Sequence, residues 1–179
     1  MSTSDETLAA AAASGDAPAF GCLVERHYDR IFRLAYRVLG NRADAEDVAQ
    51  EVCVALPAKL RGWRGEARFA TWLHRVTLNA ARDALRRQAT RARAGDGWGE
   101  VERLRQEETG ERNAALDWLA AAMAALRPEL RETVALVLGE VMTHAEAAEV
   151  LGLSEGTVSW RMSEVRKTLR ALAEKEERV

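Results

Sequence analysis

Apolar residues recur at intervals of three and four positions along most of the chain, and no segment shows a convincing alternation of apolar and polar residues. The three-to-four interval is typical of helices that bury one face, whereas alternation would be typical of half-buried strands. Only three prolines interrupt the 179 residues. The chain is therefore predicted to be all-α.

Two helix-rich blocks flank a segment that contains three closely spaced glycines, Gly95, Gly97 and Gly99. Glycine at this density disfavours a helix and favours a flexible connection. We therefore predict two small helical domains joined by a flexible linker, in which residues 100–108 form a short helix. The predicted boundaries are a flexible N-terminus at 1–15, domains at 16–90 and 113–173, the linker at 91–112, and a C-terminal tail at 174–179.

The most specific local motif lies between residues 143 and 169. Thr143 and Glu146 have the spacing of a capping box at the start of a short helix. Gly152 is placed to end this helix, and Ser154 is placed to cap the next one. The apolar stripe of that second helix is predicted to be Val158, Met162, Val165 and Leu169. This order predicts a DNA-binding helix-turn-helix, with an ordinary αα-hairpin of a helical bundle as the alternative.

The opposite face of the second helix carries the candidate contacts to DNA. Trp160 is unusual on such a face, and it predicts a contact with a thymine methyl, a sugar edge or a protein partner. The candidate contacts are Ser154, Thr157, Ser159, Trp160, Arg161, Ser163, Glu164, Arg166 and Lys167.

The charges of the first domain are unevenly distributed, although the whole chain has a net charge of only -2. Residues 61–93 contain nine arginines and two carboxylates, hence a local balance of +7. Residues 44–51 contain four carboxylates and no basic residue. A basic and an acidic face are typical of a protein with two different partners, and two solvated helix faces are the alternative.

Several classes of function find no support in the sequence. Cys22 and Cys53 are far apart and form no Cys-x-x-Cys pair, so we expect two buried free thiols and no metal site. The three histidines are isolated, and no glycine-rich phosphate loop is present, which argues against an enzyme. We expect no cofactor, no membrane insertion and no secretory signal, and hence a cytoplasmic protein.

Three segments, in order, resemble the sigma-70 family of bacterial transcription initiation factors. Residues 20–39 and 44–52 resemble regions 2.1 and 2.2, residues 69–87 resemble regions 2.3 and 2.4, and residues 126–132 with 143–170 resemble region 4. The short linker leaves no room for a domain between regions 2 and 4, as in the extracytoplasmic-function (ECF) subgroup. The resemblance implies a non-catalytic specificity subunit that binds core RNA polymerase and recognises the minus-10 and minus-35 promoter elements.

The resemblance also implies roles for individual residues. Asn79 would read a flipped minus-10 base, a loop at 64–67 would shape its pocket, and the arginines would hold phosphates. Trp63, Phe69 and Trp72 are either stacking platforms or core, and helical spacing favours core for the last two. The implied polymerase contacts are Asp44, Asp47, Gln50 and Glu51, on a coiled coil of the β′ subunit. The implied minus-10 contacts are Arg64, Gly65, Glu66, Trp72, Arg75, Asn79, Arg82, Arg86 and Arg87.

The second domain departs from the common family pattern at three positions. Many members have a basic residue, a serine and an arginine where this chain has Ser159, Trp160 and Glu164. We therefore transfer no promoter consensus. The implied partners are the β′ and β subunits of core polymerase, promoter DNA and an anti-sigma factor, with a nucleoid location in the polymerase complex and a role in a stress response. A stand-alone helix-turn-helix regulator is the alternative, and it leaves the acidic and arginine-rich segments unexplained.

Overall fold

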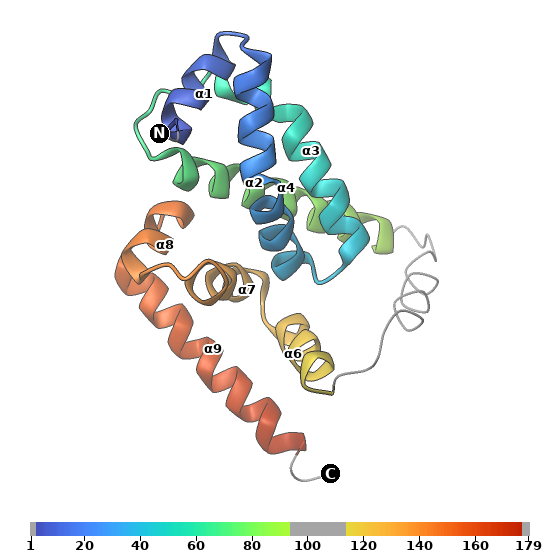
Figure 1. Cartoon of the computed structure of the whole chain (residues 1–179). Helices are drawn as coiled ribbons and strands as arrows, with labels where there is room; N and C mark the ends of the chain where they lie inside the picture. Colours follow the sequence, from blue (N-terminus) through green and yellow to red (C-terminus); the bar gives the residue numbers. More distant parts are fainter. Residues whose placement is uncertain (1–2, 94–113, 177–179) are drawn as a thin grey trace.

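The computed structural model describes residues 3–93 and 114–176, and every regular element within these ranges is helical. The prediction of an all-α chain is confirmed. The short helix expected at 100–108 lies outside the described residues. The elements are α1 (Asp5–Ala13), α2 (Ala17–Leu39), α3 (Arg42–Leu60), α4 (Phe69–Arg93), α6 (Ala114–Ala125), α7 (Pro128–Val134), the π-helix η1 (Ala135–Gly139), α8 (His144–Leu151) and α9 (Glu155–Glu176), as drawn in Figure 1.

The first bundle consists of α1 to α4, and local sequence signals set its helix ends. Asp16 and Asn41 cap the N-termini of α2 and α3 by accepting hydrogen bonds from backbone amides. Gly40 ends α2 with a φ of 72°, a conformation in which a Cβ would be strained. The buried faces of the three long helices meet in one core, whose largest fully buried side chains include Leu23, Ile31, Leu34, Leu56, Leu60, Phe69, Leu73 and Leu78.

The first fifteen residues differ from the expectation of a flexible terminus. Ser4 caps α1 by accepting a hydrogen bond from the backbone amide of Thr7. Leu8, Ala9 and Ala12 are buried against α2, α3 and α4. The local sequence is rich in alanine and has little amphipathic signal, so tertiary packing rather than local pattern places this helix.

The second bundle confirms the predicted helix-turn-helix. Thr143 and Glu146 form both hydrogen bonds of a capping box at the start of α8. Gly152 ends α8 in the left-handed conformation, with a φ of 68°. The hydroxyl of Ser154 accepts a hydrogen bond from the amide of Thr157 at 3.2 Å, as expected for the cap of α9. The predicted stripe Val158, Met162, Val165 and Leu169 packs inward, with Leu169 partly buried.

The two bundles pack against each other. Leu136 of η1 and Val150 of α8 join the same buried cluster as the core of the first bundle. Figure 1 shows α7 and α8 beneath α2 and α4, with α9 running away from the first bundle. No helix in the described part of the chain is long and apolar enough to cross a membrane.

Candidate nucleic-acid interface

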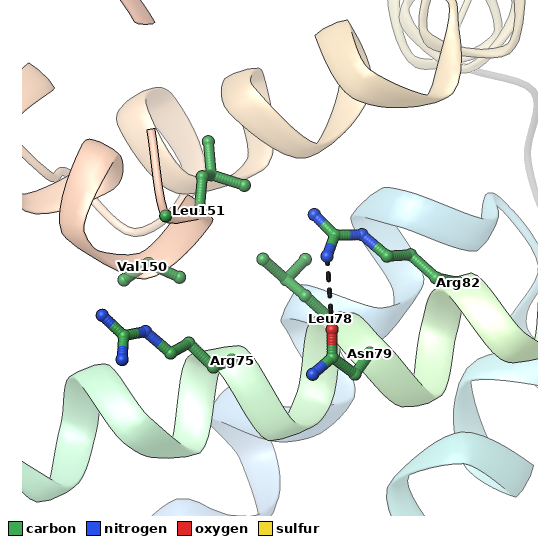
Figure 2. Close-up of a pocket in the computed structure, with 7 residues that line it drawn as sticks. Arg75, Leu78, Asn79, Arg82, Val150 and Leu151 are labelled. Carbon is green, nitrogen blue, oxygen red and sulfur yellow. Dashed lines mark hydrogen bonds between the residues drawn. The ribbon is translucent and has the colours of Figure 1, made fainter. Parts of the chain in front are cut away.

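One face of α4 carries three of the predicted DNA contacts, Arg75, Asn79 and Arg82. Spacings of four and three residues bring them to one side of the helix. With Leu78 they line a hollow whose opposite wall is formed by residues 150–152 at the end of α8 (Figure 2). The hollow measures about 340 Å³, near the lower limit for small-ligand sites, so it is too small for a duplex.

Arg82 is engaged by the second bundle. Its Nε and Nη2 donate to the two carboxylate oxygens of Glu132 on α7, at 2.7 and 2.6 Å. Hydrogen bonding to this carboxylate raises the pKa of Arg82, and Glu132 is only 4% exposed. A third donor, Nη1, holds the side-chain oxygen of Asn79 at 3.2 Å (Figure 2). A bidentate contact of this kind is also the geometry in which arginine holds phosphate.

Arg75 contacts the C-terminal turn of α8. Its Nε and Nη2 donate to the backbone carbonyl of Glu149 at 3.2 and 2.5 Å. A guanidinium at this place satisfies a terminal carbonyl and complements the negative end of the helix dipole. The α4 face predicted to contact DNA is thus occupied at both ends by the second bundle.

The remaining basic residues of the predicted minus-10 set are more accessible. The side chain of Arg86 is 77% exposed and pairs only with Asp83 among the described residues. Arg87 pairs with Glu51 on α3 at 2.9 Å. Arg64 and Glu66 are exposed in the turn before α4, which Gly65 forms with a φ of 71°.

The three aromatic residues of this region form one cluster. Phe69 is fully buried, and its ring centroid lies 5.9 Å from that of Trp63 and 5.8 Å from that of Trp72. Trp63 and Trp72 are partly buried and approach each other at 6.2 Å. Of the two alternatives, stacking platform or core residue, Phe69 is therefore a core residue. Trp72 packs into the cluster and leaves only part of its ring accessible.

The acidic face of α3, by which we mean Asp47, Gln50 and Glu51, is exposed. Within the described residues, no hydrogen bond or ion pair engages the side chains of Asp47 and Gln50. Asp44 differs from these three, because it is partly buried and accepts a hydrogen bond from Gln88 at 2.7 Å. Of the predicted polymerase contacts, Asp44 thus has a structural role within the bundle.

The exposed face of α9 carries fewer free side chains than the sequence predicts. Trp160 is 54% exposed, and Ser163 is exposed beside it. Glu164 pairs with Lys167 at 2.6 Å, and Arg166 donates to the carbonyl of Met162.

Four other predicted contacts, one in the cap before α9 and three on α9 itself, are held by hydrogen bonds within the domain. Ser154 and Thr157 hydrogen-bond to each other at 2.8 Å in the helix cap. Ser159 bonds to His144 of α8 at 2.8 Å. Arg161 turns toward α7 and donates to the carbonyl of Glu129 and the hydroxyl of Thr133. Arg161 therefore links α9 to α7 within the second bundle. Its guanidinium does not lie on the exposed face of α9.

A second charged contact between the bundles was not predicted from the sequence. Glu140, at the end of η1, accepts a hydrogen bond from Arg37 of α2 at 2.5 Å. Arg30 and His74 approach its other oxygen at 3.5 and 3.4 Å. Burial would raise the pKa of Glu140, but the hydrogen bond and charge of His74 and the charge of Arg37 outweigh it and hold the pKa below its ordinary value. No local signal reveals this contact, because its members are distant in the sequence.

Acid is expected to weaken this contact. Since the pKa of Glu140 is lower in the folded chain than in the unfolded chain, its stabilising contribution is complete above about pH 4.5. That contribution is lost as the pH falls through the lowered folded value. We expect Glu140→Gln to be less stable than the wild type at neutral pH and to lose less stability on further acidification, as measured by urea unfolding. Equal acid slopes for Glu140→Gln and the wild type would contradict this assignment, and Glu129→Gln, at a more exposed pair on α7, is the control.

The two cysteines differ in exposure. Cys22 is exposed, so the expectation that both cysteines are buried is wrong for this residue; it sits on the outer side of α2 beside the buried Leu23. Cys53 is partly buried, and burial raises the pKa of its thiol. Among the described residues, no group of three or more His, Cys, Asp or Glu side chains is arranged to hold a metal ion.

Family models match both bundles. The model described as Sigma-70 region 2 matches residues 23–91, and the model described as Sigma-70, region 4 matches residues 116–169. Each model therefore covers one of the two candidate DNA-binding surfaces, and the two follow in the order expected from the sequence.

Curated relatives and a solved structure extend the likeness over most of the chain. ECF RNA polymerase sigma factor SigE of Mycolicibacterium smegmatis is 34% identical, over 86% of this chain and 61% of the relative. ECF RNA polymerase sigma factor SigM of Mycobacterium tuberculosis is 31% identical, over 94% of this chain and 84% of the relative. The structure of CnrH in complex with the cytosolic domain of CnrY is 33% identical, with a TM-score of 0.70 over 96% of this chain and 97% of that one.

Proposed function

Because the chain belongs to the ECF subgroup of the sigma-70 family of RNA polymerase sigma factors, we propose a division of its surfaces among polymerase and two promoter elements. A sigma factor binds core RNA polymerase and directs promoter-specific transcription initiation. The observation that carries the proposal is the presence of both family regions, in order, on two folded bundles that carry an exposed acidic face on α3 and a basic helix, α4.

The acidic face of α3 is proposed to bind core polymerase on the β′ coiled coil. Asp47 and Gln50 support this role because they are exposed and have no partner among the described residues. Glu51 lies one helical turn after Asp47, and in its pair with Arg87 both side chains are half-exposed. Such surface pairs are worth less than about 1 kcal/mol, so the carboxylate is readily exchanged for a stronger partner.

The basic face of α4 is proposed to bind and help open the minus-10 element. Asn79 is exposed and presents amide donors beside Arg82, the arrangement needed to read the edge of an unstacked base. Arg75, Arg82 and Arg86 would bind the backbone phosphates on either side of that base. The exposed turn with Arg64, Gly65 and Glu66 would border the captured base, while Trp72 would support this turn from below.

The N-terminal half of α9 is proposed to enter the major groove of the minus-35 element. Trp160 and Ser163 are the side chains best placed for base edges, with Arg166 and Lys167 for phosphates. Ser159 and Arg161 are proposed to support DNA binding indirectly. Their hydrogen bonds to α8 and α7, respectively, fix the position of α9 in the domain.

The likeness to the relatives supports three further proposals, on a protein partner, on catalysis and on location. CnrH is an RNA polymerase sigma factor whose structure is a complex with the cytosolic domain of CnrY, and we propose that this chain also has a protein partner, which acts as its anti-sigma factor. We also propose that the chain has no catalytic activity of its own. Its proposed place is the cytoplasm, at the nucleoid when it is bound to polymerase.

Transcription in vitro with core polymerase and a library of genomic promoter fragments tests the function. We expect the folded protein to enrich a defined set of start sites that core polymerase alone does not use. The absence of any enrichment would refute the sigma role. A gel shift on duplex DNA without polymerase distinguishes a sigma factor from the alternative, a stand-alone helix-turn-helix regulator. Such a regulator would bind its site tightly by itself.

A further inference from the structure

The N-terminal helix α1 meets the start of α4, whose own N-cap residue is unsuited to capping. The carbonyl of Arg68 accepts a hydrogen bond from the amide of Trp72 at 3.1 Å, so Arg68 stands at the N-cap position. Arginine has no acceptor in its side chain, and its charge is unfavourable at a helix N-terminus. Instead, Oε1 of Glu6 on α1 accepts a hydrogen bond from the amide of Phe69 at 3.4 Å. The acceptor and the negative charge that this helix end favours therefore come from a distant segment of the chain.

Asp5, the neighbour of Glu6, fastens α1 to the same place. Its carboxylate accepts hydrogen bonds from Nε2 of His27 at 2.9 Å and from Nη1 of Arg26 at 3.0 Å. His27 is only 5% exposed, and its ring meets the ring of Phe69 edge-on at a centroid distance of 5.2 Å. Burial outweighs the attraction of Asp5 and lowers the pKa of His27, so the ring is neutral at neutral pH and donates through Nε2. Helix α1 thus contacts the amide of Phe69 directly and its ring through His27.

The turn at 61–68 depends on this anchor, because it runs from the end of α3 to Phe69. At its start, the amide of Trp63 donates to the carbonyl of Leu60 at 3.1 Å, and the Trp63 ring packs against Phe69. In the part of the chain that the structure describes, no hydrogen bond engages residues 64–67. Figure 1 shows this turn passing beside α1 before it enters α4. The conformation of the turn is therefore set by its two ends, and the later end is Phe69.

We propose that Glu6 is a positioning residue for minus-10 recognition, because it caps α4 from another helix and so fixes the turn that borders the captured base. The inference rests on the proposed function in one respect, namely that the turn at 61–68 faces the minus-10 strand. It deepens that function by giving α1 a part in promoter selectivity, although the DNA contacts proposed above all lie outside α1.

Glu6→Ala in the full chain tests the cap directly. We expect the amide of Phe69 to exchange with deuterium about fivefold faster, the fold-change that corresponds to the loss of a typical N-cap interaction. The backbone order parameters of residues 64–67 should fall at the same time. The control is Glu25→Ala, which removes an exposed carboxylate from α2 of the same bundle. NMR spectroscopy measures both quantities residue by residue.

The consequence for recognition is measured in the complex with core polymerase. Permanganate reactivity on templates with every single-base change in the minus-10 element gives the selectivity, as the ratio between the preferred base and the others. We expect Glu6→Ala to lower this ratio by about fivefold at one position, in line with the loss of the cap, and to leave the affinity for core polymerase unchanged. A general loss of stability would instead reduce open complexes on all templates alike and leave the ratio unchanged.

Two further variants distinguish capping from other effects of the substitution. Glu6→Gln keeps a side-chain oxygen that can accept from Phe69, and it should retain most of the selectivity. In Glu6→Ala/Arg68→Asn, a neutral side chain that caps well should restore the slow exchange and the ratio, relative to Arg68→Asn alone. Unchanged exchange at Phe69 in Glu6→Ala, or faster exchange with unchanged selectivity, would overturn the proposal. Start-site enrichment by the wild type decides the proposed function separately, because it does not depend on the change at Glu6.

Discussion

Reversal of charge at Asp47 and Glu51 together is expected to weaken binding to core polymerase by about a hundredfold or more. Like charges placed opposite each other in an interface cost several kcal/mol, and 2.7 kcal/mol corresponds to about a hundredfold. Both positions are exposed on α3, and arginine has a good helix propensity, so the fold should tolerate the Asp47→Arg/Glu51→Arg variant. The lost pair between Glu51 and Arg87 is a surface contact with a small effect on stability.

The measurement is the affinity for core polymerase by fluorescence titration, with cooperative thermal unfolding as the check on folding. The matched control is Glu25→Arg/Asp29→Arg, which reverses two exposed carboxylates at the same four-residue spacing on α2. Arg87→Ala separates the loss of the intramolecular pair from the loss of the polymerase contact. If Asp47→Arg/Glu51→Arg binds core polymerase like the α2 control, the docking assignment is wrong.

Local sequence signals predicted the elements that depend on neighbouring residues. The capping box at Thr143, the helix end at Gly152 and the cap at Ser154 each involve residues within a few positions of one another. The stripe that begins at Val158 follows from helix geometry alone. For the same reason, the all-α class and the helix-turn-helix could be read without knowledge of the tertiary structure.

Contacts between the bundles could not be predicted in this way. Glu132 is 50 residues from Arg82, and Glu140 is 103 residues from Arg37. Neither glutamate differs, in its local sequence, from a solvent-exposed helical glutamate. Only the packing of α7 and η1 against α4 and α2 buries them and gives them arginine partners.

Helical position also proved a poor guide to individual long side chains. Arg161 lies on a flank of α9 that the helical wheel assigns to DNA, yet its flexible stem carries the guanidinium to Glu129 and Thr133 on α7. A helical wheel predicts only the direction of the Cβ atom. The guanidinium at the end of a long arginine side chain can still reach either flank of the helix. The α1 helix was missed for the opposite reason, because Leu8 and its alanine neighbours give little local pattern and are ordered by the surface they cover.

Substitution of Asn79 by alanine is expected to reduce open-complex formation by roughly tenfold to a hundredfold without loss of affinity for core polymerase. A specific bidentate contact between a side chain and a base is worth about 1–3 kcal/mol of discrimination. Asn79 is exposed on α4 beside the end of α8, whereas the acidic face of α3 lies next to Arg87, so the loss of Asn79 should leave polymerase binding intact. The change should also relax the preference for one base of the minus-10 element.

The contrast with Arg86→Ala separates the reading of bases from the holding of phosphates. The side chain of Arg86 is 77% exposed and should contact only the DNA backbone, so its loss should weaken all promoter variants about equally. Open complexes are measured by permanganate reactivity of unpaired thymines on a set of templates with every single-base change in the minus-10 element. Because Asn79 also accepts a hydrogen bond from Arg82, a uniform loss in Asn79→Ala would mean that the residue merely positions that arginine. A loss concentrated at one base position, which Arg86→Ala does not reproduce, is the result that assigns base reading to Asn79.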